Sequence, residues 1–285
     1  MTQAPALPLA GTTILDVSRM LPGAVLARSL LDLGARVIKI EDPRSGDLLR
    51  LAPPLVGGIG VGFCVYFRGA ESVGLDLREA DGVAALRQLA RGADVLIESF
   101  RPGTMDRFGL SAATLRADNP RLVQCSLPGF LGNAEVGHDL NFTGMTGFLR
   151  AVTEHGIPAL QIADVTSGIL ASAAILAALL QRTRTGVGCE LRQPLLAGPL
   201  PFVTWTAAEA AAGGGGMARA MLGGAIAAYR CYRCADGLEL SVGCLEPKFW
   251  IAPSSPAPAS TPDPRALRRR PRCRPGSRDS PANTG

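Results

Sequence analysis

Histidine and lysine are the scarcest charged or titratable residues in this chain of 285 amino acids. Its histidines are His138 and His155, and its lysines are Lys39 and Lys248. His155 stands in the run GluHisGlyIlePro, which is typical of a loop. The shortage of lysine, beside abundant arginine, alanine and proline, is typical of a GC-rich gene.

Cysteine pairs of the kind that hold zinc are missing. Cys231 and Cys234 form a CxxC, but no second pair and no nearby histidine completes a zinc set, so we expect no metal. The cysteines number seven, an odd number that cannot pair completely. The start of the chain lacks the charged region and the long apolar stretch of a signal peptide. Both features predict reduced thiols and a cytoplasmic location.

Long apolar runs and phosphate-loop motifs are also absent. The most apolar run, residues 169–180, is too short to span a bilayer and contains Ser172. This run therefore predicts a buried helix, and we expect no membrane partner. The glycines at 213–216 lack the lysine and hydroxyl residue that end a phosphate-binding loop, and they are more typical of a flexible crossover.

Excess charge of either sign is absent from the body of the chain. Residues 251–285 hold seven arginines and two aspartates, which accounts for the whole net charge of +5. The remainder is neutral, so we expect no nucleic-acid partner.

The tail over residues 251–285 also holds eight of the 22 prolines and almost no aliphatic residues, which predicts disorder. Binding to nucleic acid or to an anionic membrane would suit its arginines. A frameshifted reading of a GC-rich gene is the interpretation we favour.

Short apolar runs alternate with helical patterns over the first 130 residues. After the first run, Pro22 opens a helical pattern that Gly34 closes. This alternation predicts a parallel sheet with helices on both faces and ligands at the carboxyl ends of its strands. The predicted strands are residues 12–17, 36–41, 72–77, 94–99 and 122–126, with a further helix over 80–92.

Three segments follow from the remaining patterns. We expect a large Rossmann-like domain over residues 1–186, which ends with a long helix running from Asp164 to about Arg182. Residues 187–250 form the crossover and part of a small domain, with AlaAspGly at 235–237 as the turn of a hairpin. Residues 251–285 form the tail.

His138 stands in a setting unlike that of a packing histidine. It follows a glycine and precedes Asp139 within the glycine- and asparagine-rich run PGFLGNAEVGHDLNFTGMTG. A histidine buried for packing needs no such setting, whereas a base that approaches a substrate does. A structural role for His138 is the alternative.

Several distinctive motifs follow one another along the chain. They are LDVSRMLPG, LLDLGARVIKIEDPRSGDLLR, GLDLREADG, ADVLIESFRPGTMDRFGLS and NPRLVQCSLPGF, followed by the His138 segment, QIADVTSG and LEPKFW. Together they resemble family III CoA-transferases, and most closely the alpha-methylacyl-CoA racemase branch. The resemblance runs from about residue 10 to 250. It implies a Rossmann-like large domain, a smaller domain and two chains interlinked as rings in a homodimer. The last hundred or so residues of the family, which return to the large domain, have no counterpart.

Racemisation beside a thioester needs two bases, one on each face of the carbon. One base removes the weakly acidic proton while the other returns a proton. His138 and Asp164 are the natural pair, although Asp164 could instead cap the helix that follows it. The resemblance adds Glu246 as the carboxylate that partners the histidine. It also places Asp139 and Tyr229 near the reacting carbonyl, where they would support an enolate.

CoA carries phosphates that arginines recognise well. The resemblance assigns Leu75, Arg78, Arg101 and Arg107 to CoA binding, although Arg107 could be a surface helix residue. No cofactor is implied, because CoA is part of the substrate. One departure is that only Arg68 remains of a basic stretch usual in the family. Another is that CysGluLeuArgGlnPro at 189–194 stands where relatives carry an aspartate and a methionine.

Three functions remain open on this basis. The favoured one is a racemase or epimerase that inverts C2 of 2-methylacyl-CoA thioesters. The second is a CoA-transferase in which Asp164 attacks the thioester and passes through an anhydride. The third is a truncated remnant without catalytic activity, which the tail at 251–285 suggests.

Overall fold

The computed structural model describes residues 6–132, 135–152, 157–214, 216–246, 248–249 and 274–275. His155 and most of the tail over 251–285 lie outside the described residues. The chain divides into two compact units, Met1–Val203 and Thr204–Gly285. The first unit extends past the boundary predicted at residue 186.

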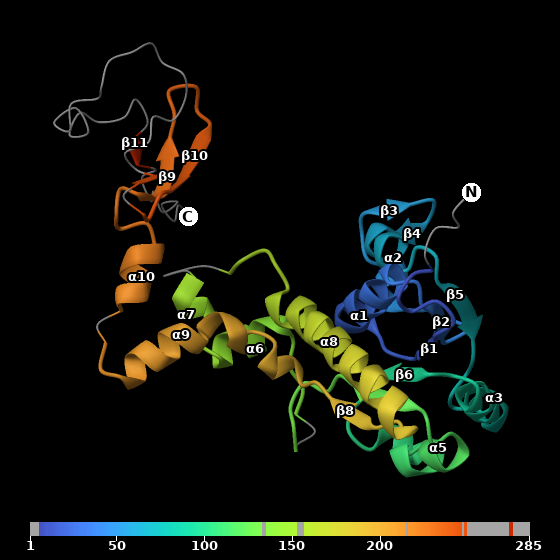
Figure 1. Cartoon of the computed structure of the whole chain (residues 1–285). Helices are drawn as coiled ribbons and strands as arrows, with labels where there is room; N and C mark the ends of the chain where they lie inside the picture. The colour runs from blue at the N-terminus through green and yellow to red at the C-terminus, as the bar shows by residue number, and fades with distance from the viewer. Residues whose placement is uncertain are drawn as a thin grey trace, which may run out of the picture. The chain divides into compact units, whose positions relative to one another are not determined.

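The first unit is built on a six-stranded parallel sheet with the order β5-β2-β1-β6-β7-β8 (Figure 1). From β1 the strand order runs outward in one direction through β2 and β5, and from β6 it runs in the other direction through β7 and β8. Ligands bind at such a switch point in sheets of this kind. The predicted Rossmann-like α/β fold is therefore confirmed. The strands are β1 (Thr13–Asp16), β2 (Arg36–Glu41), β5 (Glu71–Gly74), β6 (Val95–Glu98), β7 (Val123–Ser126) and β8 (Glu190–Arg192). A separate two-stranded hairpin pairs β3 (Leu55–Val56) with β4 (Ile59–Gly60).

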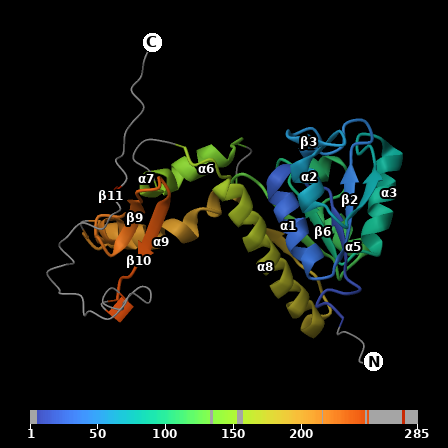
Figure 2. The same ribbon diagram turned by 90° about the horizontal axis from the view of Figure 1, so that it is seen from above.

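Helices cover both faces of this sheet. Figure 2 shows α1 and α8 on one side and α3 on the other. Side chains such as Ile97 and Cys125 pack toward α1 and α8, whereas the alternate residue Leu96 packs toward α3 and α5. The helices of this unit are α1 (Met20–Asp32), α2 (Val61–Tyr66), α3 (Ala80–Arg91), α4 (Thr104–Arg107), α5 (Ala112–Asp118), α6 (Asp139–Met145), α7 (Phe148–Val152) and α8 (Ile162–Thr185), with 3-10 turns η1 (Leu48–Arg50) and η2 (Leu195–Ala197).

The second unit contains the predicted hairpin. β9 (Tyr229–Arg233) pairs antiparallel with β10 (Glu239–Gly243), and β11 (Arg274–Pro275) pairs with the other edge of β9. The crossover expected after residue 186 contains β8, η2, α9 (Leu200–Ala211) and α10 (Met217–Leu222). Alanine is the best helix former, and α9 is rich in alanine.

Helix α8 is the longest element and packs along α1. By length and composition it could cross a membrane, but half of its most apolar window of 18 residues is buried in the fold. The predicted buried helix is thus found, with Ala171 and Ile175 in the core and Ile169 exposed on the other side. Its start at Ile162 precedes the predicted start at Asp164.

Gly168 allows α8 to approach α1. A Cβ atom there would lie 2.7 Å from the carbonyl oxygen of Pro22 and 2.9 Å from the Cβ of Val25. Because Gly168 follows Asp164 by about one helical turn, this contact also sets the position of the Asp164 side chain.

We predict that Gly168→Ala lowers the free energy of unfolding by about 1–3 kcal/mol, because the added methyl group overpacks the contact between the helices. Gly62→Ala is the matched control, since a Cβ at Gly62 would meet one side-chain atom at 3.9 Å. In α2 that change should be neutral or stabilising by up to about 1 kcal/mol. Urea denaturation followed by circular dichroism measures both, and equal effects would contradict the packing argument.

Candidate active site

The start of α6 and the start of α8 meet at a pair of acidic residues. His138 is the residue before α6 in an extended conformation, and its N–H donates to the Asn141 side chain at 2.9 Å. Asp139 begins α6, and its carboxylate accepts the backbone N–H of Asp164 at 3.0 Å. The first N–H groups of a helix have no partner within it, so Asp139 supplies one for α8.

Asp164 is buried and carries a strongly perturbed carboxyl group. It is only 9% exposed, and the Gln161 amide donates to its Oδ2 at 3.2 Å. Burial is the main cause and the charge of Asp139 the second cause of a pKa of Asp164 that is raised to about 6, against an opposing effect of His138. Asp164 is the third residue of α8 and does not cap it, since Gln161 holds the cap position. The capping alternative is therefore not what the structure shows.

An aromatic contact holds this corner together. The rings of Phe130 and Phe142 pack edge to face with centroids 5.3 Å apart, and Phe142 is fully buried beside Ala163 of α8. A Cβ at Gly137 would lie 2.8 Å from the Phe142 ring. The glycine before His138 therefore allows the loop to pass over this ring, which places His138 at the entrance to α6.

A small apolar hollow adjoins Asp139. It has a volume of about 270 Å³ and is lined by Asp139 together with side chains that include Leu140, Leu149, Ile157 and Leu160. Apolar walls with a carboxylate at one side suit a ligand with an apolar group next to a reacting centre.

A second hollow, of about 340 Å³, lies at the carboxyl ends of β1, β2 and β5. Leu75 and Arg78 both line it, and we call it the Arg78 pocket. Their role in ligand binding stays a prediction. The Arg78 guanidinium pairs with Asp76 at 2.8 Å and with Asp42 at 2.7 Å. Arg101 and Arg107 are exposed near α4 and do not line this pocket.

Two basic residues near the Arg78 pocket were not singled out from the sequence. Arg19 lines it, with its guanidinium over the Phe100 ring at 5.5 Å from the centroid. Arg44 pairs with Asp76 at 2.7 Å and so stands beside Arg78. Arg19 could have been found, because it belongs to the loop directly after the first strand, where ligands are expected. Nothing in the sequence pattern distinguishes Arg44 from a surface arginine.

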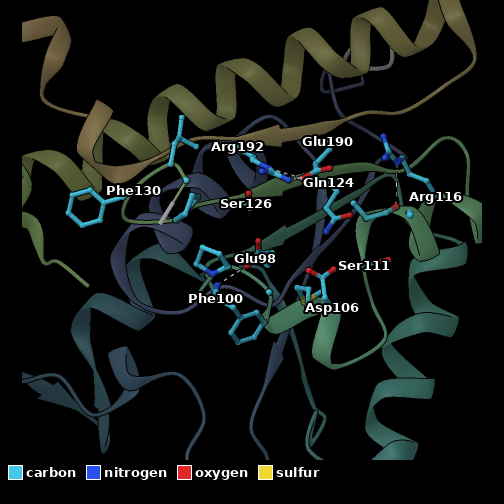
Figure 3. Close-up of a pocket in the computed structure, with 18 residues that line it drawn as sticks. Glu98, Phe100, Asp106, Ser111, Arg116, Gln124, Ser126, Phe130, Glu190 and Arg192 are labelled. Atoms are coloured by element: carbon cyan, nitrogen blue, oxygen red, sulfur yellow. Dashed lines mark hydrogen bonds and ion pairs between the residues drawn. The ribbon is translucent and has the colours of Figure 1, made fainter. Parts of the chain in front are cut away.

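A third hollow, of about 690 Å³, opens on the sheet face that carries α5. Side chains of three adjacent strands, Glu98, Gln124 and Arg192, turn toward it (Figure 3). Burial raises the pKa of Glu98 to about 7, against the hydrogen bond of 2.7 Å that Glu98 accepts from the N–H of Phe100. Among the described residues, Oε1 of Gln124 is a buried atom without a hydrogen-bond partner. This strongly polar wall was not predicted.

Two predicted site residues belong to the second unit. Glu246 is exposed after β10, and Tyr229 is half-buried at the start of β9. His138, Asp139 and Asp164 all lie in the first unit. The structure therefore brings those three together, and the roles of Glu246 and Tyr229 stay predictions. Within the described ranges, no group of three or more histidine, cysteine or acidic side chains could hold a metal ion.

These features define an α/β protein with an acidic centre and a basic pocket at the carboxyl edge of a Rossmann-like sheet. The model of CoA-transferase family III matches residues 9–261. Human alpha-methylacyl-CoA racemase is 32% identical over 254 residues, covering 85% of this chain. Succinate–glutarate CoA-transferase of Agrobacterium fabrum is 36% identical over 204 residues, covering 66% of this chain and 51% of that protein. The chain belongs to CoA-transferase family III.

A solved structure agrees with this assignment. The crystal structure of a CaiB/BaiF family protein from Brucella suis is 31% identical, covers 82% of this chain and superposes with a TM-score of 0.72. The chain spans 63% of the length of the human racemase and 65% of that of the Brucella protein.

We predict that Asp139→Asn lowers the pKa of Asp164 toward the usual value of an aspartate, by at most about one unit. The variant removes a neighbouring negative charge but keeps an oxygen that can accept the Asp164 N–H. NMR titration of protein labelled with ¹³C in the aspartate carboxyl carbons measures this, with Asp164→Asn identifying the signal. An unchanged Asp164 pKa would show that Asp139 has no electrostatic effect.

We predict that Glu98→Gln stabilises the protein at alkaline pH. The folded pKa of Glu98 is raised, so this carboxyl favours the fold at low pH and loses that stability as the pH rises through about 7. The variant should gain on the order of 2–3 kcal/mol over the parent at pH 8 and much less at pH 4.5. Urea denaturation at both values tests this, with Glu79→Gln, at an exposed position, as control. A difference independent of pH would refute it.

Proposed function

We propose that this protein is an acyl-CoA racemase or epimerase that inverts C2 of 2-methyl-branched acyl-CoA thioesters. One observation carries the proposal: two groups able to move protons, His138 and Asp164, share one corner, close enough for His138 to affect the Asp164 pKa. The CoA-transferase chemistry described above uses Asp164 but requires no histidine. The similarity to the human racemase over most of the chain supports the same choice.

The electrostatics of Asp164 suit a base. A hydrogen next to a thioester carbonyl is weakly acidic, so a base of raised pKa removes it more readily. With a pKa of about 6, Asp164 is more basic than an ordinary aspartate and still mostly ionised at pH 7. In one direction the Asp164 carboxylate takes the proton from C2 and the His138 imidazolium returns a proton to the opposite face. In the other direction the roles exchange.

The pockets suit the two ends of the substrate. The Arg78 pocket would receive the phosphates of CoA, with Leu75 and Arg78 in its wall. Arg101 and Arg107, which do not line this pocket, would contact phosphate outside it. The apolar hollow beside Asp139 would take the branched acyl group. Asp139 and Tyr229 would support the enolate, and Glu246 would hold His138 in the correct tautomer.

The remaining properties follow from the same assignment. We propose that the whole protein is a cytoplasmic homodimer without a resident cofactor, since CoA arrives and leaves as part of the substrate. Neither a membrane nor a nucleic acid is needed for the reaction.

CoA transfer is the second candidate, favoured by the 36% identity to a succinate–glutarate CoA-transferase. There the Asp164 carboxylate attacks the thioester carbonyl and releases CoA thiolate, giving an acyl-aspartyl anhydride. The thiolate then attacks the aspartyl carbonyl, and the released acid makes room for an acceptor carboxylate. This route needs an acceptor acid, whereas racemisation does not.

We predict that the protein incorporates deuterium from D₂O at C2 of 2-methylacyl-CoA when no acceptor carboxylic acid is added. Asp164→Asn and His138→Gln should each reduce this exchange at least about 100-fold, because each removes one proton-transfer group. His155→Gln, which changes the other histidine, is the control and should exchange as the parent does. Mass spectrometry of the recovered thioester measures the exchange.

The alternatives give different results in the same assay. CoA transfer that depends on an acceptor acid, with an Asp164 adduct trapped by hydroxylamine and no exchange at C2, would contradict the racemase proposal in favour of the transferase. A protein with neither activity and no cooperative thermal transition would support the inactive remnant.

A further inference from the structure

Lys39 is fully buried between two buried aspartates. It lies on β2 directly opposite Asp16 on β1, and its side chain is 1% exposed. Its Nζ atom lies 3.5 Å from Asp16 Oδ2 and 3.2 Å from Asp47 Oδ2, and these carboxylates are 0% and 1% exposed. The Phe67 ring covers it, with its centroid 5.1 Å from Nζ.

The cluster of Lys39, Asp16 and Asp47 holds the loop between β1 and α1. Lys39 donates to the carbonyl oxygen of Ser18, and Asp16 accepts both the Ser18 hydroxyl and, at 2.8 Å, the Ser18 N–H. Asp47 accepts the N–H of Met20 at 3.3 and 3.4 Å. Met20 needs such support, since its φ of +63° lies in the left-handed region that a side chain disfavours.

Stability alone is a poor explanation for this arrangement. Removing a lysine and two carboxylates from water is costly, and apolar residues of similar volume often stabilise a fold as well or better. The cluster also retains an excess negative charge. What apolar residues could not do is bind the Ser18 carbonyl and the Met20 N–H, which together determine the path of the loop.

The loop forms one wall of the Arg78 pocket. Ser18 and Arg19 line this pocket together with Arg78, and the buried Lys39 and Asp47 lie in its wall behind them. The Arg19 N–H donates to Ser99 Oγ at 2.8 Å, and its guanidinium lies over Phe100. The path of the loop therefore sets the distance between the Arg19 and Arg78 guanidinium groups, on which binding of a phosphate-bearing ligand depends.

We propose that Lys39 is a positioning residue for CoA: through Ser18, Asp16 and Asp47 it holds the loop that presents Arg19 to the Arg78 pocket. This inference rests on the proposed binding of CoA in that pocket. Lys39 also belongs to the lining of the Arg78 pocket, but its side chain is only 1% exposed, so it offers a ligand almost no surface and acts through the loop.

The test must separate positioning from stability. Lys39→Met alone leaves two buried carboxylates without a cation and is expected to destabilise the fold strongly. Lys39→Met with Asp47→Asn restores the net charge of the cluster but cannot bind the Ser18 carbonyl. Arg182→Met is the matched control, because it breaks a mostly buried pair with Asp94 (2.8 Å) at the amino ends of the strands, away from the pocket.

Titration calorimetry with free CoA, below the melting temperature of each variant, gives the decisive readout. We expect the double variant to bind CoA at least tenfold more weakly than the parent, and Arg182→Met to bind like the parent despite its lower stability. Faster amide exchange of Met20 in the double variant is expected as well. If the double variant binds CoA as tightly as the parent, the positioning role of Lys39 is overturned, whereas the proposed CoA pocket is not. A folded parent that binds no CoA would overturn the proposed pocket and this role with it.

Discussion

One hydrogen bond, from the backbone N–H of Asp164 to the carboxylate of Asp139, joins the two helices that make up the acidic centre. It satisfies an N–H group at the start of a buried helix, where water has little access. It also brings a second negative charge to Asp164, which burial has already made hard to ionise. A structural requirement of α8 thus produces a carboxylate of unusual basicity.

The rest of the first unit serves to place these two helix ends. Gly168 lets α8 lie against α1, and α1 is itself anchored by the loop that the Lys39 cluster holds. The Arg78 pocket and the acidic centre therefore share one support, the segment between β1 and α1. This shared support explains why a charged cluster can matter to a ligand to which it offers almost no exposed surface.

The sheet and its covering helices could be predicted because their signals are local. The run ArgValIleLysIleGlu carries apolar residues on both faces, with Val37 on one and Ile38 and Ile40 on the other, and Gly34 ends α1 with a φ of +93°. The association of His138 with Asp164 depends on a contact between segments 25 residues apart, and the motifs, not periodicity, predicted it. The same holds for Leu75 and Arg78.

Arg44 and the polar wall around Glu98 have no local signal, because their environment arises when strands distant in sequence become neighbours. β8 was missed because three residues rich in charge do not resemble a buried strand.

The most direct test of this account is the pKa of Asp164 in the unmodified protein. Infrared difference spectroscopy follows the carboxylic-acid band through a pH titration, and Asp164→Asn identifies the band. The account predicts a band that disappears with a midpoint near pH 6, because burial and Asp139 hold the proton on Asp164. A midpoint near 4, the value of an exposed aspartate, would mean that Asp164 is solvated and would contradict its proposed role as a base.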